Sequence, residues 1–472
     1  MTRATDPQIS FADLEFIKQG IQLDPILKAI SDFVDAHAVL VEHVRCDLEW
    51  GLKKPSTGRN GLTAQQALRS LTLMRVKNWD YRELRERITD GYTLRHFTHF
   101  NSKRVPKHDA FNRAFNKLKP ETLRAINDAV IRAAVDRGIE DGKKLRVDTT
   151  VVETDIHHPT DNTLLWDTVR MVTRLVGQLN ELVPGGVGPF TKRTRCARRR
   201  MQEIQRMTPK ERQTQQVRKY RELIAVTEQV VKDAGAVVER TKEVPDVDLV
   251  TELAIKGIRS EIGRYCGLGG RVTSQARRRV LQGEQVPNEE KLYSIFETHT
   301  DLIKRGKVQK PVEFGHKVFI AESGHGLITQ YAVLTGNPAD QVHVKPSLQG
   351  HKQAFKRAPE LYSGDRGFSS EETIKACKEA GVKLPCIPQS GGKRSAERQA
   401  LEKSPEFKKG QRFRAGIEGR ISVLFRGRGM KRALGEGREH FELLVGAAVL
   451  VNNLLVIAAL LTKKAKRQRR AA

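Results

Sequence analysis

A single β-strand pattern, isolated between two long helical stretches, is the feature that most limits how this chain can fold. In residues 145–151 the apolar Leu145, Val147 and Val151 alternate with polar residues, as in a half-buried strand. One strand cannot pair its own backbone groups, so it must join a sheet built from other parts of the chain. The next clear strand patterns come only after residue 310. We therefore expect a mixed α/β core with a helical insertion after its first strand.

Helical periodicity covers the sequence on both sides of this strand. Residues 10–140 carry amphipathic stripes, and Asp80 with Glu83 three residues later has the spacing of a capping box. Helix, short turn and helix fit a DNA-binding helix-turn-helix, and they fit ordinary helical packing equally well. Residues 161–305 are helical and basic, with breaks expected at 184–189 (PGGVGP) and in the loop-like run 266–270 (CGLGG).

Strand patterns return in the last third of the chain. Residues 312–322 and 327–334 are expected to pair as a hairpin across the turn at 323–326. Further elements follow in the order strand, helix, strand, helix: residues 360–364, 369–380, 383–387 and 412 onward. The apolar segment 443–461 is long enough for a membrane span, but Asn452 and Asn453 lie at its middle, where polar side chains are costly in lipid. It is expected to be a buried core helix.

These patterns divide the chain into five segments. They are an N-terminal helical and expected DNA-binding domain (1–140), the first strand segment of the core (141–160), a basic helical insertion (161–305), the remainder of the core (306–462) and a basic tail (463–472).

The charge of the chain calls for a polyanionic partner. Its 84 Lys and Arg outweigh 56 Asp and Glu, giving a net charge of +28. Nucleic acid is the leading candidate, because phosphate neutralisation releases counterions. Twelve basic residues, among them Arg198, Arg199 and Arg200, face three acids between residues 191 and 222. A second basic stretch covers 412–438, and the basic tail is expected to be a solvated, disordered segment.

The sequence gives little support for several other classes of protein. The five cysteines are few and widely spaced, which suits a reducing, cytoplasmic compartment and gives no zinc or redox pattern. The sequence contains no G-x-x-x-x-G-K-[ST] loop, so nucleotide hydrolysis is not indicated. The first residues show no apolar signal segment, and we expect no membrane partner.

Three acids lie where the expected core would expose them. Asp148 is inside an apolar strand, where an acid is costly, and Asp365 is at a strand end between glycines that leave room for a ligand. Glu418 lies on the late helix, four residues after Arg414 and beside the apolar stripe. Converging carboxylates suit Mg²⁺ or Mn²⁺, and two such ions about 4 Å apart promote in-line phosphodiester displacement.

A purely structural role stays open as an alternative for each acid. Asp365 fits a turn, Glu418 fits an ion pair with Arg414, and Asp148 fits a bend cap. Asp340 is an alternative second acid, although its loop (GNPAD) is more turn-like. The run 155–161 (DIHHPTD) has metal-ligand residue types, but a polar strand exit explains it better. His316 and His325, in the expected hairpin, are interpreted as structural or DNA-contacting.

From Asp148 onward the chain resembles the DDE transposases of bacterial insertion sequences, which carry an RNase H-like core. The matching segments are residues 147–152 (VDTTVV), 313–318 (EFGHKV), 336–340 (GNPAD), 363–368 (SGDRGF), 416–422 (GIEGRIS) and 447–455 (AAVLVNNLL). Residues 81–84 through 97, and 106–115, resemble the N-terminal helical region of the family. The resemblance covers roughly residues 60–460.

The resemblance implies DNA cleavage and joining at insertion-sequence ends, with Asp148, Asp365 and Glu418 as the ligands of two catalytic ions, Mg²⁺ or Mn²⁺. It implies that the partner is double-stranded DNA, both the transposon ends and the target. It also implies at least a homodimer when two ends are joined, and association with the nucleoid. Many relatives space Tyr, Arg, Glu and Lys as Y-x2-R-x3-E-x6-K. Here Arg414 and Glu418 fit, whereas Gln411 and Phe425 replace Tyr and Lys.

DNA contacts are accordingly expected from basic residues near the acids as well as from the insertion. Those near the acids are Arg366, Arg414, Arg420, Arg426 and Lys431, of which Arg426 or Lys431 is a candidate substitute for the missing Lys. Two other functions stay open: a metal-dependent RNase H-like nuclease, and a catalytically silent DNA-binding protein derived from a transposase.

Overall fold

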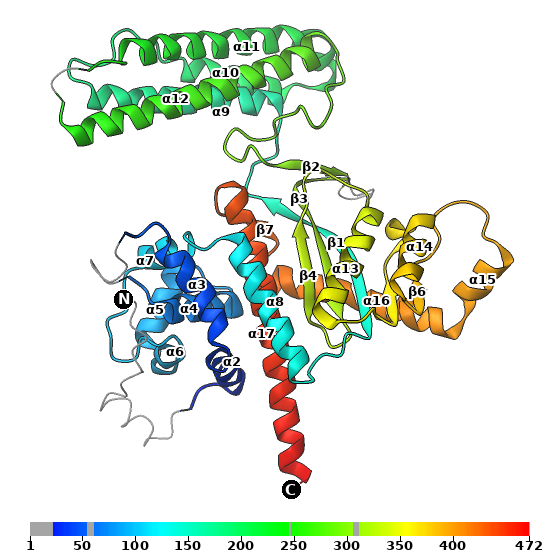
Figure 1. The fold of residues 1–472 in the computed structure, drawn as a ribbon. Coiled ribbons are helices and arrows are strands. Elements are labelled where there is room, and N and C mark those ends of the chain that lie inside the picture. The colour runs from blue at the N-terminus through cyan, green and yellow to red at the C-terminus, as the bar shows by residue number, and fades with distance from the viewer. Residues whose placement is uncertain (1–21, 54–60, 245–246, 305–310, 472) are drawn as a thin grey trace. The chain divides into compact units, whose positions relative to one another are not determined.

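The computed structural model describes residues 22–53, 61–244, 247–304 and 311–471. The predicted helical residues 10–21 lie outside this part. The chain divides into two compact units, one formed by residues 1–153 and 316–472 and the other by residues 154–315. Each unit has its own core, and the protein is a mixed α/β protein in which helices predominate (Figure 1).

The first unit begins with helices and enters the sheet at residue 144. The helices are α2 (Pro25–Asp35), α3 (Ala38–Glu49), α4 (Ala64–Lys77), α5 (Tyr81–Asp90), α6 (Tyr92–Phe97), α7 (His108–Phe115) and α8 (Pro120–Asp136). As predicted, Asp80 caps α5, because its side chain accepts hydrogen bonds from the backbone N–H groups of Arg82 and Glu83.

The mixed sheet has the strand order β2-β3-β1-β5-β6, with β4 paired to β3 and β7 paired to β1. Its strands are β1 (Lys144–Thr154), β2 (Asp301–Lys304), β3 (Val312–Ser323), β4 (Ile328–Val333), β5 (Leu361–Ser363), β6 (Leu384–Cys386) and β7 (Arg432–Ala433). The antiparallel β3–β4 pair confirms the predicted hairpin. β5 is parallel to both β1 and β6.

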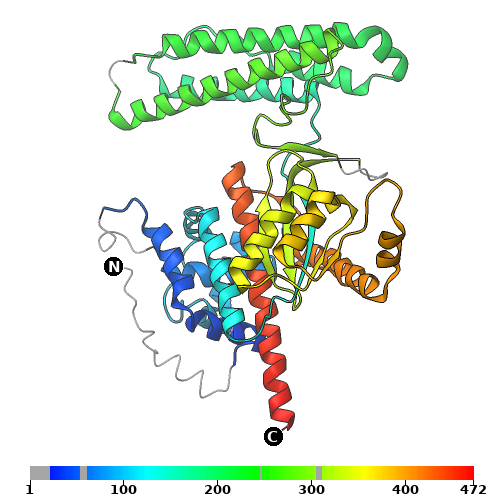
Figure 2. The same cartoon turned by 45° about the vertical axis from the view of Figure 1, so that its right-hand side comes forward.

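Side-chain alternation decides what each face of this sheet contacts. Along β3, Val318 and Ile320 pack with α16 (Pro405–Gly427) and α17 (Gly437–Ala471). Phe319 and Ala321 belong to a different core, with α13 (Val344–Phe355) and α14 (Glu371–Ala380). Figure 2 shows these two helices, in yellow, lying in front of the strands. On β1, Leu145 and Val147 belong to the core on the α13–α14 side. Because side chains alternate along a strand, Arg146 and Asp148 face the opposite side, toward α16.

The apolar C-terminal segment is a core helix, as predicted. By length and composition α17 is suited to cross a membrane, yet 72% of its apolar window is buried inside the protein. Its first half packs on the sheet through Phe441 and Val445, and its second half packs on the N-terminal helices through Leu454 and Ile457. The expected disordered tail is wrong for residues 463–471, because α17 continues through them.

In its described residues, the second unit is built from four long helices around a separate apolar core. They are α9 (Asp161–Leu182), α10 (Thr194–Arg206), α11 (Pro209–Arg240) and α12 (Leu249–Ala276), followed by the short π-helix η1 (Arg277–Leu281). The predicted break at 184–189 follows the end of α9. The helical prediction for residues 301–304 is wrong, since they form β2 and pair with residues 312–315 of β3.

The predicted loop at 266–270 is also wrong, because α12 passes through it without interruption. The reason is helix packing: a Cβ atom at Gly269 would lie 2.4 Å from Thr168 Cγ2 on α9. Gly269 therefore allows two helices to approach closely, a role that a single sequence does not distinguish from a helix break.

Gly269→Ala is expected to destabilise the second unit by about 1–3 kcal/mol, because the added methyl overpacks the α9–α12 contact. The matched control is Gly270→Ala. Nothing lies within 4 Å of a Cβ there, so the better helix propensity of Ala should stabilise the unit by up to about 1 kcal/mol. Thermal unfolding followed by circular dichroism measures both changes, and equal effects of the two variants would contradict this account.

Candidate active site

Asp148 is a buried acid at the centre of the sheet. It lies on β1, is 8% exposed and accepts a hydrogen bond at Oδ1 from the backbone N–H of Thr149 at 2.8 Å. Burial raises the pKa of Asp148 to about 6; the negative charges of Asp365 and Asp340 add to the rise, and Arg414 opposes it. The residue is therefore poorly stabilised as an anion by the protein alone.

Asp365 reaches the same region from the neighbouring strand. β1 and β5 are parallel, with Arg146 opposite Ser363; Asp148 lies two residues after Arg146 on β1, and Asp365 lies two residues after Ser363, just beyond the end of β5. Asp365 begins the 3-10 turn η3 (Arg366–Phe368) and accepts the backbone N–H of Gly367 at Oδ1, at 2.9 Å. The strand register thus explains why these two acids meet.

Glu418 is the third predicted acid, and α16 carries it. This helix begins with a capped turn at Ser404 and packs its apolar stripe, including Ile417 and Leu424, on the sheet. Gly410 allows close packing, because a Cβ there would lie 2.3 Å from Cys386 Sγ on β6. The Glu418 side chain is 67% exposed, so it stands at the open side of the cluster.

Arg414 holds the three acids together. Its Nη2 lies 3.1 Å from Asp148 Oδ2 and 3.7 Å from Asp365 Oδ2, and its Nη1 lies 3.0 Å from Glu418 Oε1. Since Asp148 and Asp365 share one nitrogen, their oxygens are at most about 7 Å apart, a gap that two ions about 4 Å apart can bridge. Residues far apart in sequence are therefore brought together around one guanidinium.

A fourth acid, Asp340, belongs to the same cluster. It begins the 3-10 turn η2 (Asp340–His343), and its Oδ1 accepts from Thr149 Oγ1 at 2.9 Å and contacts Lys317 Nζ at 2.7 Å. Its Oδ2 lies beside Gly367, the residue whose N–H binds Asp365. The structure places both Asp365 and Asp340, the alternative second acid, near Asp148. No role was predicted for Lys317, although it lies in the matching segment 313–318.

The other residues predicted to contact DNA differ in exposure and in whether their side chains are engaged by other protein groups. Arg366, Arg426 and Lys431 are exposed. The Arg420 guanidinium faces inward, donating to Glu322 and Asn452.

In the second unit, Arg198 and Arg199 are exposed, whereas Arg200 is engaged with Glu203 and Glu222. The run 155–161 supplies structural contacts: His157 Nε2 lies 2.6 Å from Asp167 Oδ2, and Asp161 accepts from Arg279 and Gln275.

Among the described residues, one group of three metal-ligand residue types has donor atoms all within 4.8 Å of one another, and it is not the group around Arg414: it consists of Glu140, Asp141 and His325. Glu140 is fully buried on its side chain and accepts from Ser323 Oγ, from the N–H of His325 and from the N–H groups of Asp141 and Gly142. These bonds occupy the carboxylate in organising the turn before β1. His316 is buried, contacts Arg438 and makes a T-shaped ring contact with Phe441.

Comparison with protein-family models, with curated proteins and with solved structures finds no match for this chain.

Proposed function

We propose that this chain is a DNA transposase that cleaves and joins phosphodiester bonds at the ends of an insertion sequence, with an RNase H-like core. The observation that carries the proposal is the gathering of Asp148, Asp365 and Glu418 around Arg414 from two parallel strands and a helix packed on the sheet. The sequence resemblance to DDE transposases names the same three acids.

The donor set fits hard divalent cations. Asp148, Asp365 and Glu418 would hold Mg²⁺ or Mn²⁺, all through oxygen atoms. The raised pKa of Asp148 supports this fit, because a buried carboxylate without enough positive charge nearby gains most from a cation. When bound, the ions would activate the attacking oxygen and stabilise the leaving oxygen of the DNA strand.

The chain's own cations would handle the phosphate. Arg414 presents a fork-shaped guanidinium that suits a phosphate group, and it stands between the acids and within reach of both strands that carry them. Lys317, 12% exposed on its side chain, supplies a second positive charge through its contact with Asp340. These two groups would orient the scissile phosphate, and Glu418 lies at the exposed side from which DNA would approach.

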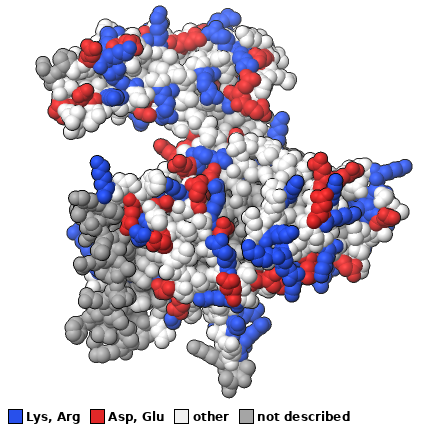
Figure 3. Space-filling model, viewed as in Figure 1, with Lys and Arg blue, Asp and Glu red and all other residues white. Residues whose placement is uncertain are grey.

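Charge on the surface supports a DNA partner. Lys and Arg are mixed with Asp and Glu over most of the visible face, but the exposed end of α17 carries basic residues without acids (Figure 3). Lys463, Lys466, Arg467 and Arg470 recur at three- and four-residue spacing, so they share one face of the helix. Such a face can neutralise phosphates, alongside the exposed Arg198 and Arg199.

The test is an assay on labelled duplex DNA carrying the two borders of the element that encodes the chain. With Mg²⁺ or Mn²⁺ we expect 3′-end cleavage and joined products, and EDTA should abolish both while leaving binding. Hydrolysis without joining would instead indicate a nuclease. Binding without either product would indicate a silent DNA-binding protein and overturn the proposal.

A further inference from the structure

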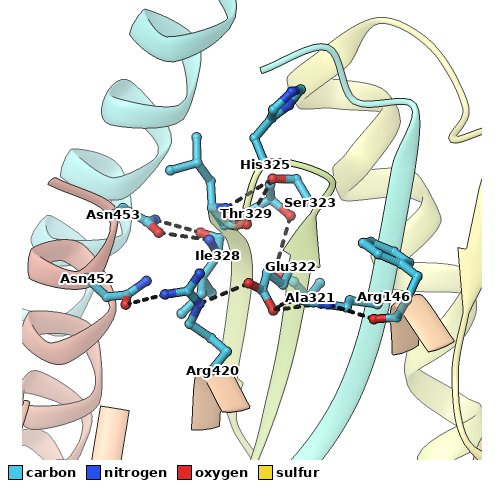
Figure 4. A network of polar contacts seen from close by, with 12 residues as sticks. Arg146, Ala321, Glu322, Ser323, His325, Ile328, Thr329, Arg420, Asn452 and Asn453 are labelled. Carbon is cyan, nitrogen blue, oxygen red and sulfur yellow. Dashed lines mark hydrogen bonds and ion pairs between the residues drawn. The ribbon is translucent and has the colours of Figure 1, made fainter. Parts of the chain in front are cut away.

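Glu322 is a completely buried carboxylate that the reaction itself does not use. It lies on β3, next to β1, and its side chain is 0% exposed. Arg146 donates to its Oε2 from Nε at 2.8 Å and contacts it from Nη2 at 2.7 Å. Arg420 donates to its Oε1 from Nε at 2.9 Å (Figure 4). Each carboxylate oxygen is thus held by a different arginine.

Both arginines connect this carboxylate to α16. Arg420 belongs to α16, and Arg146 Nη1 donates to the backbone carbonyl of Phe413 at 2.6 Å. Gly416 makes this contact possible, because a Cβ there would lie 2.2 Å from Arg146 Nη1. Charge-assisted bonds from a rigid sheet therefore hold α16 at residue 413 and at residue 420.

These two attachment points flank the site residues on the helix. Arg414 and Glu418 lie between them, one residue after the first attachment point and two residues before the second, so each is within one turn of helix of an attachment point. On β1, Arg146 lies two residues before Asp148 and on the same face of the strand. A single carboxylate thus links the strand that carries the buried acid to the helix that carries the other two groups.

The contacts continue into α17. Arg420 Nη1 donates to Asn452 Oδ1 at 3.2 Å, and Asn453 pairs with the backbone N–H and carbonyl of Ile328 on β4 at 2.8 Å each (Figure 4). The two polar residues in the middle of the apolar helix therefore have a structural purpose. They fix the helix on the far side of Arg420, so the guanidinium is held from two directions.

We propose that Glu322 is a positioning residue, which with Arg146 and Arg420 fixes the placement of α16 so that Arg414 and Glu418 meet Asp148 and Asp365. This inference rests on the proposed function for its effect on cleavage, but the placement of α16 is measurable without any reaction. It also gives Arg420 a role inside the protein in place of the DNA contact predicted for it.

The experiment compares Glu322→Gln with Glu442→Gln. Gln keeps the size of the side chain but removes the negative charge. Its amide NH₂ group, a donor, would also face an arginine N–H group, which is another donor. Glu442 is the matched control, since it also joins two arginines, Arg124 at 2.6 Å and Arg438 at 2.9 Å, and these lie on α8 and α17. Two readouts are recorded: hydrogen exchange of the amides of residues 413–420 in the DNA-free protein, and the Mg²⁺ dependence of cleavage.

For Glu322→Gln we expect exchange in residues 413–420 to rise about tenfold or more, and cleavage to fall about 10- to 100-fold. The Mg²⁺ concentration that gives the half-maximal rate should rise, while the Kd for DNA stays within about twofold of the wild-type value. General destabilisation of the protein would not change one of these quantities without the other. Glu442→Gln should change neither readout. If Glu322→Gln does not fold, Arg420→Lys, which keeps the charge but loses the fork, takes its place.

Unchanged exchange in residues 413–420, or equal effects of the Glu322 and Glu442 variants, would overturn the positioning role. If the wild type gives no metal-dependent cleavage but Glu322→Gln still loosens residues 413–420, the proposed function fails and the placement of α16 by Glu322 stands. The two failures are therefore distinguishable.

Discussion

Asp365→Asn is expected to lower metal-dependent strand cleavage by at least about a thousandfold, equivalent to about 4 kcal/mol of transition-state stabilisation, and Asp148→Asn should do the same. Asn keeps the shape of Asp but removes the negative charge that would hold a divalent ion. The change leaves the basic residues on the surface untouched, so the Kd for end DNA should stay within about threefold. Single-turnover cleavage of labelled DNA and a gel-shift titration measure the two quantities.

The matched control for this prediction is Asp141→Asn. Asp141 belongs to the other group of ligand types, with Glu140 and His325, and pairs with Lys143 at 3.2 Å. Its substitution should leave cleavage within about twofold. Retained cleavage in Asp365→Asn would remove Asp365 from the chemistry. A large loss of cleavage in Asp141→Asn would place a required metal site at the turn before β1.

Local patterns were enough to predict most elements of the α/β core. The β3–β4 hairpin, the short strands β5 and β6, and the buried α17 follow from alternation, turn residues and apolar length. The same reasoning marked Asp148, because an acid inside an apolar strand is costly without a partner. Glu322 gives the same signal, at the end of the apolar run VFIA on β3, but no role was predicted for it.

Local patterns do not contain information on the contacts between distant segments. The meeting of Arg414 with Asp148 joins residues 266 positions apart, and that of Arg146 with Glu322 joins residues 176 apart. Glycines show the same limit. Gly269 resembles a helix break in sequence, but it is a packing position, because what it contacts is Thr168 on another helix. Such roles depend on tertiary neighbours that one sequence does not reveal.

The metal-free wild type is expected to lose about 3 kcal/mol of unfolding free energy relative to Asp148→Asn as the pH rises from about 3 to about 7. The folded-state pKa of Asp148 is raised from 3.8 to about 6, and each pKa unit is worth about 1.4 kcal/mol. Between these two values the folded state binds the proton more tightly than the unfolded state. The stabilisation is therefore fully present below about pH 4 and is lost as the pH passes through about 6.

Hydrogen exchange of the β1 amides, compared between wild type and Asp148→Asn at each pH, measures this difference, because intrinsic exchange rates cancel in the comparison. Mg²⁺ should recover most of the loss in the wild type above pH 7, since a bound cation favours the ionised carboxylate, and should recover little in Asp148→Asn. Parallel pH profiles would contradict the burial argument for Asp148. Equal stabilisation of both proteins by Mg²⁺ would show that the ion binds elsewhere. The same buried charge thus destabilises the empty fold and favours the cation that the proposed reaction needs.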